Sequence, residues 1–209
     1  MVLRKFMSFM GRLLYRQQYE FLKVKLLEEY GEFKRTYEGT YNKTLEKLLV
    51  SGEDHRFLHH FGFDFIAICR AVKKRIFNNK SEGASTIEQQ VVRVLTNDFR
   101  KTFSRKIKEI FLSTTLSELV PKKDLPGIYL HIAYFGNGMI GLKQVFKKLH
   151  IYRPHAISNE TCAEIIARIK YPEAQKQGFK RARQIEMRKD HLLHLYDKHR
   201  SYKFFRIYG

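Results

Sequence analysis

One stretch of the chain, residues 53–64, reads EDHRFLHHFGFD and separates two segments with helical spacing. Before it, residues 13–49 carry apolar side chains at intervals of three and four, with an expected break at residues 31–41. After it, Asp64 is expected to cap a helix that runs from Phe65 through Ile76. Acidic, aromatic, histidine and glycine residues therefore lie at fixed offsets on an irregular turn between two helices.

The rest of the chain also predicts helices, and no segment has a strand period strong enough to anchor a sheet. Residues 78–83 (NNKSEG) predict a loop, and Ser85 with Glu88 predicts a capping box that starts the next helix. Residues 135–141 (FGNGMIG) predict a tight glycine turn between helices. Further helices are expected at residues 104–119, 158–169 and 178–196. We expect a mostly α fold, with an N-terminal amphipathic helical extension at residues 1–44 and a single domain at residues 45–209.

The charge of the chain limits its partners. Its 209 residues include 40 Lys and Arg against 21 Asp and Glu, a net charge of +19 that attracts nucleic acid, anionic lipid or phosphate-bearing substrates. An apolar share of 44% excludes a disordered basic tail, and two cysteines exclude a disulfide scaffold. Residues 196–206 interleave aromatic and basic side chains, but no recognised nucleic-acid motif is present and a membrane-facing tail explains them equally. We therefore expect no nucleic-acid partner.

The N-terminal residues predict an amphipathic helix. No uncharged apolar run reaches the length of a transmembrane helix, and Arg12 and Arg16 interrupt the apolar region that a signal peptide would need. Two interpretations stay open: the helix binds in a membrane interface, or it packs on the domain's own core. Its expected apolar face consists of Leu3, Phe6, Met7, Met10, Leu13 and Leu14.

Three motifs contain residue types suited to transfer from a phosphorylated donor. In residues 53–64, a carboxylate beside aromatic rings suits general-base chemistry, although it could merely cap a helix. Residues 83–90 (GASTIEQQ) place two hydroxyls, backbone N–H groups and two amides at a helix start, where anions bind well. In residues 105–109 (RKIKE), Arg105 and Glu109 share a helix face beside Lys106, which suits a diphosphate leaving group or a plain surface ion pair.

Together, these motifs resemble those of the family 51 glycosyltransferases, the peptidoglycan transglycosylases. The family patterns E-D-x-x-F-x-x-H-x-G-x-D, G-x-S-T-I-x-Q-Q and R-K-x-x-E are met at every fixed position and in the same order. The resemblance covers residues 45–196. It implies a lysozyme-like transglycosylase domain that polymerises lipid II, a disaccharide-pentapeptide on undecaprenyl diphosphate, into β-1,4 glycan strands by inverting transfer.

The resemblance also implies roles for individual residues. Glu53 would be the base that takes the proton from the acceptor hydroxyl, and Glu109 the second catalytic carboxylate. Arg105 and Lys106 would balance the charge of the leaving diphosphate. Arg93, where the family usually has lysine, would also contact the substrate. The other expected substrate-binding residues are Asp54, His60, Ser85, Thr86, Gln89 and Gln90.

The chemistry of the substrate suggests cofactors and partners. No metal-binding pattern accompanies His55, His59 and His60, so the residues assign no cofactor; the one candidate is a Mg²⁺ or Mn²⁺ ion at the diphosphate. The expected partners are lipid II or a related polyprenyl-diphosphate glycan, the growing strand, an anionic membrane surface and other cell-wall synthesis proteins. By resemblance, the protein would lie peripherally on the outer, periplasmic face of the bacterial inner membrane, with residues 63–80 dipping into the bilayer.

The sequence departs from the family in its fourth motif, K-x-x-I-L-E-x-Y-L-N. Pro126 and Gly127 replace its Leu-Glu, and His131 replaces its Asn. This change leaves a non-catalytic scaffold open. Two further alternatives rest on other grounds: a transferase acting on another polyprenyl-linked glycan, since no transmembrane anchor is expected, and a lysozyme-like glycan cleaver, since such enzymes also pair carboxylates on an α fold. The Arg105–Lys106 pair argues against a cleaver, because hydrolysis releases no diphosphate.

Overall fold

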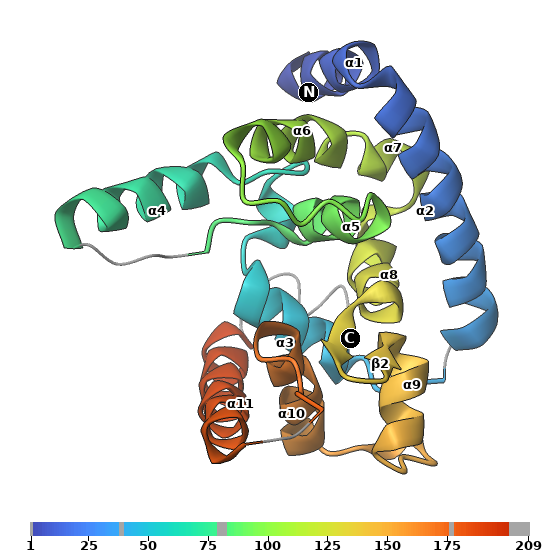
Figure 1. Cartoon of the computed structure of the whole chain (residues 1–209), viewed down its shortest axis with the longest axis vertical. Helices are drawn as coiled ribbons and strands as arrows, with labels where there is room; N and C mark the ends of the chain where they lie inside the picture. Colours follow the sequence, from blue (N-terminus) through green and yellow to red (C-terminus); the bar gives the residue numbers. More distant parts are fainter. Residues whose placement is uncertain (1, 38–39, 79–82, 176–177, 201–209) are drawn as a thin grey trace. The chain divides into compact units, whose positions relative to one another are not determined.

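The computed structural model describes residues 2–37, 40–78, 83–175 and 178–200, and it consists mainly of helices (Figure 1). The predicted mostly α fold is confirmed. The chain forms two compact units, residues 1–28 with 56–125 and residues 29–55 with 126–209. The predicted division into an extension at 1–44 and a domain at 45–209 stays a prediction.

In its described part, the first unit contains helices and connecting segments but no strand. Its helices α5 and α6 pack on each other, and α1 packs on α6, whereas α4 extends away from them (Figure 1). Its elements are α1 (Val2–Leu14), the first part of α2 (Arg16–Tyr37), the 3-10 helix η1 (Phe57–His59), α4 (Phe65–Asn78), α5 (Ile87–Leu95), α6 (Phe103–Ser113), α7 (Leu116–Leu119) and the 3-10 helix η2 (Lys122–Asp124). Its largest fully buried side chains include Leu22, Leu26, Phe57, Ile87, Leu112 and Leu116.

The second unit is built around three helices that pack on one another, α3, α10 and α11. Fully buried leucines of α3, among them Leu45, Leu48 and Leu49, face this core. The unit contains the rest of α2, α3 (Thr44–Glu53), α8 (Leu125–Ile132, from Pro126 on), the strands β1 (Tyr134–Gly136) and β2 (Met139–Ile140), α9 (Gly141–Lys148), the 3-10 helix η3 (Pro154–Ala156), α10 (Asn159–Lys170) and α11 (Phe179–His199).

Side-chain caps start several of the predicted helices. Asp64 Oδ1 accepts hydrogen bonds from the backbone N–H groups of Ile66 at 3.0 Å and Ala67 at 3.2 Å, so its predicted capping of α4 is confirmed. The predicted capping box at Ser85 is wrong by one residue. Thr86 is the N-cap of α5, because its hydroxyl accepts from the Gln89 backbone N–H and also donates to the carbonyl of Gly62 at 2.6 Å.

Two predicted helix boundaries are also wrong. The expected break at 31–41 does not begin at Gly31, since α2 continues to Tyr37. The expected helix over 104–119 is divided into α6 and α7. The division lies at Thr114 and Thr115, whose hydroxyls donate to helix carbonyls three residues back, each at 2.7 Å.

The predicted glycine turn at 135–141 is a short antiparallel hairpin of β1 and β2. Gly136, Gly138 and Gly141 all have positive φ, which glycine adopts without strain. Glycines therefore shape this segment as predicted, but a pair of strands stands where no strand was expected. Residues 79–82 of the predicted loop and residues 201–206 of the basic aromatic tail lie outside the described residues.

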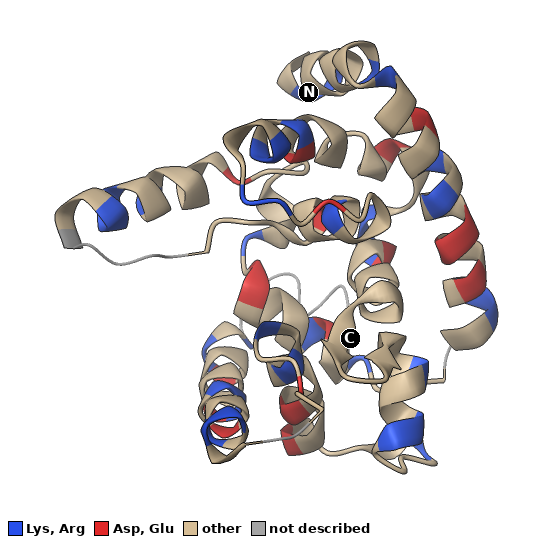
Figure 2. Ribbon diagram, in the orientation of Figure 1, with Lys and Arg blue, Asp and Glu red and all other residues tan. Residues whose placement is uncertain are grey.

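Basic side chains occur on helices of both units, including α4, α6, α9 and α11 (Figure 2). Within the described part of the chain, no helix combines the length and the hydropathy needed to cross a membrane.

Candidate active site

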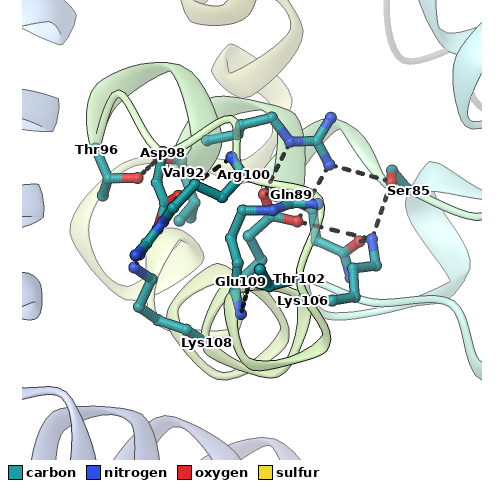
Figure 3. Close-up of polar contacts among 12 residues, drawn as sticks. Ser85, Gln89, Val92, Thr96, Asp98, Arg100, Thr102, Lys106, Lys108 and Glu109 are labelled. Atoms are coloured by element: carbon teal, nitrogen blue, oxygen red, sulfur yellow. Dashed lines mark hydrogen bonds and ion pairs between the residues drawn. The ribbon is translucent and has the colours of Figure 1, made fainter.

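Six of the predicted site residues come together in the first unit, where α5 packs on α6 (Figure 3). We call this group the cation cluster. Three cationic side chains in it surround a single carboxylate, which is only 1% exposed. The members are Ser85, Gln89, Arg93, Arg105, Lys106 and Glu109.

Glu109 is the centre of the cation cluster. Arg93 grips it with two nitrogens, since Nε lies 2.8 Å from Oε1 and Nη2 lies 3.1 Å from Oε2. Arg105, one helical turn before Glu109 on α6, donates a further hydrogen bond to Oε1. Because Glu109 binds Arg93 of α5 and Arg105 of α6, it fixes both guanidinium groups. Its pairing with Arg105 is the one predicted from their spacing of four residues.

Lys106 occupies the side of the cluster nearest to Ser85. Its Nζ lies 2.9 Å from Ser85 Oγ, 2.6 Å from Gln89 Oε1 and 3.7 Å from Glu109 Oε2. Burial lowers the pKa of Lys106 to about 8, and the charges of Arg93 and Arg105 act in the same direction, while Glu109 opposes them. The ammonium group therefore carries its charge near neutral pH and loses it under mildly alkaline conditions.

Gln89 adds a hydrogen-bond donor to the cluster. Its side chain is fully buried, and its Nε2 has no hydrogen-bond partner among the described residues. A buried amide nitrogen of this kind is costly unless a ligand oxygen accepts from it. Together with Lys106 and Arg105, it is suited to a ligand with several anionic oxygens.

The turn of the first motif is held by residues that flank it in the first unit. Gly62 has a φ of +115° and donates from its backbone N–H to His60 Nδ1 at 3.4 Å. Lys122 donates to the His60 carbonyl and lies 2.9 Å from Glu88 Oε1. The Thr86 hydroxyl bonds to the Gly62 carbonyl, so the second motif supports the first. His60 and Thr86 thus hold the turn, and their predicted contacts with substrate stay predictions.

Glu53 and Asp54 belong to the second unit, at the end of α3. One oxygen of Glu53 lies 2.9 Å from Arg188 Nη2 of α11, which also donates to the Gly52 carbonyl at 3.0 Å. The Glu53 side chain keeps 20% of its surface exposed, while Arg188 keeps 8%. The predicted base is therefore oriented by an arginine and remains reachable by solvent.

Arg188 was missed by the sequence reasoning. It lies three residues after Ile185 and four before Leu192, so it shares the buried face of α11 with two core side chains. A charge on the apolar face of a predicted helix is the signal that could have found it, because such charges are almost always paired.

A second ion-paired group adjoins the cation cluster but contains none of its residues (Figure 3). Arg100 binds Asp98 with two nitrogens, each at 2.9 Å, and Lys108 Nζ lies 2.6 Å from Asp98 Oδ2. These hydrogen bonds hold the pKa of Asp98 well below its usual range. The three side chains line part of a pocket of about 500 Å³ whose other wall includes Gln17 and Phe21 of α2.

The cation cluster does not fit a resident metal ion. Its one carboxylate is engaged by Arg93 and Arg105, and its other members are cations, an amide and a hydroxyl. Elsewhere, in the second unit, Glu29, Glu32 and His131 bring three donor atoms within 4.8 Å of one another. The same contacts are those of a histidine–carboxylate ion pair, with Nε2 3.2 Å from Glu29 Oε2.

Comparison with known proteins gives the same assignment as the motifs. Residues 24–196 match the transglycosylase family, whose domain has a lysozyme-like fold. Penicillin-binding protein 1A of Rickettsia typhi is 31% identical over 179 residues, covering 81% of this chain and 22% of that protein. The biosynthetic peptidoglycan transglycosylases of Nitrosospira multiformis and Haemophilus influenzae are 31% and 40% identical, over 61% and 47% of this chain and 56% and 41% of those proteins.

The chain thus spans about a fifth of the penicillin-binding protein and about half of the two biosynthetic transglycosylases. The matched region includes all three motifs, the cation cluster and Glu53 with its partner Arg188. The chain belongs to the transglycosylase family.

Proposed function

We propose that this chain is a peptidoglycan glycosyltransferase that polymerises lipid II into β-1,4 glycan strands. The observation that carries the proposal is the cation cluster, in which Arg105 and Lys106 stand beside an orphaned buried amide and a hydroxyl. Such a site is suited to a diphosphate that gains charge as it leaves, because fixed cations stabilise developing charge without reorganisation.

In the proposed reaction, the 4-hydroxyl oxygen of one saccharide attacks the anomeric carbon of the donor from the face opposite the diphosphate. The bond from that carbon to the diphosphate oxygen breaks, and the configuration inverts. Glu53 accepts the hydroxyl proton, and Arg188 keeps its carboxylate in place. The diphosphate leaves with the electron pair, and Arg105 and Lys106 balance its charge. Glu109 holds Arg93 and Arg105 in position.

The altered fourth motif does not favour a scaffold over an enzyme. A Cβ on Gly127 would lie 2.4 Å from the Phe33 ring and 2.9 Å from Glu46 Oε1. Glu46 is 1% exposed, accepts a hydrogen bond from the Tyr41 hydroxyl and pairs with Lys43 at 2.8 Å. The family motif places a glutamate at the position of Gly127, which lies on α8. In this chain, the buried and paired Glu46 of α3 packs against Gly127 instead. This is a compensated change rather than a loss of packing.

We further propose that the protein acts at the outer face of the bacterial inner membrane, with other cell-wall synthesis proteins as partners. The substrate would be lipid-linked, and α4 exposes Phe65, Ile66, Ile76 and Phe77 beside a run of cations at residues 73–75. Apolar side chains flanked by Lys and Arg are suited to an anionic lipid surface. A Mg²⁺ or Mn²⁺ ion at the diphosphate stays a prediction, and no step above is assigned to it.

A polymerisation assay tests the function. Purified protein and labelled lipid II in detergent should give a ladder of glycan strands that disappears with Glu53→Gln. Glu186→Gln on α11, an exposed carboxylate that pairs with Lys189, is the matched control and should retain the ladder. Addition of EDTA to the same reaction tests the divalent ion. If lipid II yields no product while another polyprenyl-diphosphate glycan does, the substrate assignment is wrong and the transferase assignment stands.

A further inference from the structure

The apolar face of α1 points away from the unit on which the helix packs. A surface helix of a soluble protein normally turns its apolar stripe toward the core. In α1, the buried positions are instead Ser8 and Gly11, which are small and lie three residues apart on one face. Six large apolar side chains each expose 55–83% of their surface: Val2, Leu3, Phe6, Phe9, Leu13 and Leu14.

The small face is fixed to α6. A Cβ on Gly11 would lie 2.9 Å from the backbone carbonyl oxygen of Phe111, so glycine allows a contact that no other residue permits. The Tyr15 and Phe111 rings lie 6.2 Å apart, and Arg12 Nη1 lies 3.3 Å from Glu118 Oε2. The exposed apolar face therefore belongs to a docked helix rather than to a detached end of the chain.

The charge of α1 indicates what covers that face. The helix VLRKFMSFMGRLL contains three basic residues and no acidic one, in a chain of net charge +19. Lys5 and Arg12, seven residues apart, lie along one edge of the apolar face and are both exposed. Apolar side chains with cations at their edge match the acyl and headgroup layers of an anionic bilayer.

We infer that α1 lies in the plane of an anionic membrane. In that position, α1 fixes the depth of the cation cluster relative to the lipid headgroups. The last part rests on the proposed function, because α6 carries both the contact with α1 and the residues Arg105 and Lys106. A bilayer that holds α1 thereby sets the height at which these cations meet a lipid-linked diphosphate. The first interpretation of the N-terminal helix is thus favoured over packing on the domain core.

Partition onto vesicles without lipid II tests the membrane contact alone. The chain of residues 1–209 should bind vesicles of phosphatidylcholine with phosphatidylglycerol more strongly than vesicles of phosphatidylcholine alone. Phe6→Ser/Phe9→Ser should lower the partition about a hundredfold, and Lys5→Gln about fivefold. The matched control, Phe179→Ser/Met187→Ser, removes two exposed apolar side chains from α11 and should change nothing.

Equal partition of the wild type and the Phe6/Phe9 variant would overturn the inference. The inference would also be overturned if the wild type were an oligomer, this variant were a monomer, and both partitioned equally onto vesicles, since α1 would then bind a second copy of the chain. Circular dichroism of each variant confirms that the fold is retained, which exposed substitutions should allow.

Gly11→Ala tests the positioning part. The added Cβ should push α1 off α6 while leaving its apolar face and charges unchanged, so polymerisation in vesicles should fall about tenfold with unchanged vesicle binding and unchanged rate in detergent. Gly31→Ala, in the middle of α2, is the control, because its Cβ would meet only the far end of Arg35 at 3.5 Å. An equal loss in vesicles and detergent would overturn the positioning. Absence of wild-type activity in both media would instead refute the proposed function and leave the vesicle result standing.

Discussion

Arg188 Nη2 lies 2.9 Å from Glu53 Oε1, and the two residues are 135 positions apart in the chain. The same nitrogen donates to the Gly52 carbonyl, the residue just before Glu53. Gly52 leaves space for this contact, since a Cβ there would lie 3.1 Å from Arg188 Nη2 and 2.3 Å from the Leu192 side chain. The position of the proposed base is therefore fixed from α11 by one guanidinium group.

Replacing Arg188 by Gln should lower kcat by about a hundredfold, because a base displaced by a fraction of an ångström loses its alignment with the acceptor hydroxyl. The KM for lipid II should change little, since Arg188 is not expected to touch the donor. Initial rates in detergent measure both constants. Arg183→Gln, an exposed arginine on the same helix, is the control and should behave as wild type. A raised KM with unchanged kcat would show that Arg188 binds substrate instead.

The pH dependence of donor binding should report the titration of Lys106. Its pKa of about 8 means that the ammonium is charged below pH 8 and neutral above it. The KM for lipid II should therefore rise as the pH increases through about 8, by about three- to tenfold, as one charge-assisted contact with the diphosphate is lost. The measurement is KM from about pH 7 to about pH 10.

Lys106→Arg separates this effect from the titration of other groups, because arginine keeps its charge over the whole range. Its KM should be flat where that of the wild type rises. If both proteins show the same rise, another group is responsible and Lys106 does not contact the donor in its charged form.

The helices could be predicted from the sequence because their apolar periodicity agrees with the packing that the fold provides. The errors occur where tertiary contacts decide between local alternatives. Ser85 and Thr86 are both good N-caps, and Thr86 prevails because its hydroxyl also reaches the Gly62 carbonyl. Gly31 costs α2 about 1 kcal/mol relative to alanine, and the buried Leu26 and Phe33 on either side offset it.

In the candidate site, too, contacts within one helix could be predicted from the sequence, whereas contacts between helices could not. The pairing of Arg105 with Glu109 follows from their spacing of four on one helix and could be predicted. The two-nitrogen grip of Arg93 on Glu109 joins residues 16 positions apart on two helices, so it depends on how α5 packs on α6. Arg188 lies still farther from its partner in sequence, and only the packing of α11 on α3 brings them together.

Gly62→Ala should destabilise the first unit strongly. The residue has a φ of +115°, and a Cβ would lie within 2.6–2.7 Å of the backbone of Ser113 and Thr114, which cannot move without disturbing α6. Strain and overpacking together should cost about 2–4 kcal/mol of unfolding free energy. Urea unfolding measures this.

Gly138→Ala provides the comparison. This residue also has positive φ, at +69°, but a Cβ there has no neighbour within 4 Å, so only the backbone strain of about 1–2 kcal/mol applies. Similar losses for the two variants would mean that the close approach of Gly62 to α6 does not contribute to stability.

Arg93→Lys restores the residue that the family usually carries and should retain activity while lowering stability. Lysine can reach Glu109 with one contact where arginine makes two, so the free energy of unfolding should fall by about 0.5–1.5 kcal/mol. The polymerisation rate should stay within about threefold, because Arg105 still holds Glu109 and Lys106 is unchanged.

Arg100→Lys is the matched control. Arg100 also binds a carboxylate with two nitrogens, but its side chain is 72% exposed, so its replacement should cost less than about 0.5 kcal/mol of unfolding free energy. If the two substitutions cost the same, burial does not strengthen the Arg93–Glu109 pair. If Arg93→Lys instead abolishes polymerisation with an unchanged stability, then Arg93 contacts the substrate directly rather than fixing Glu109.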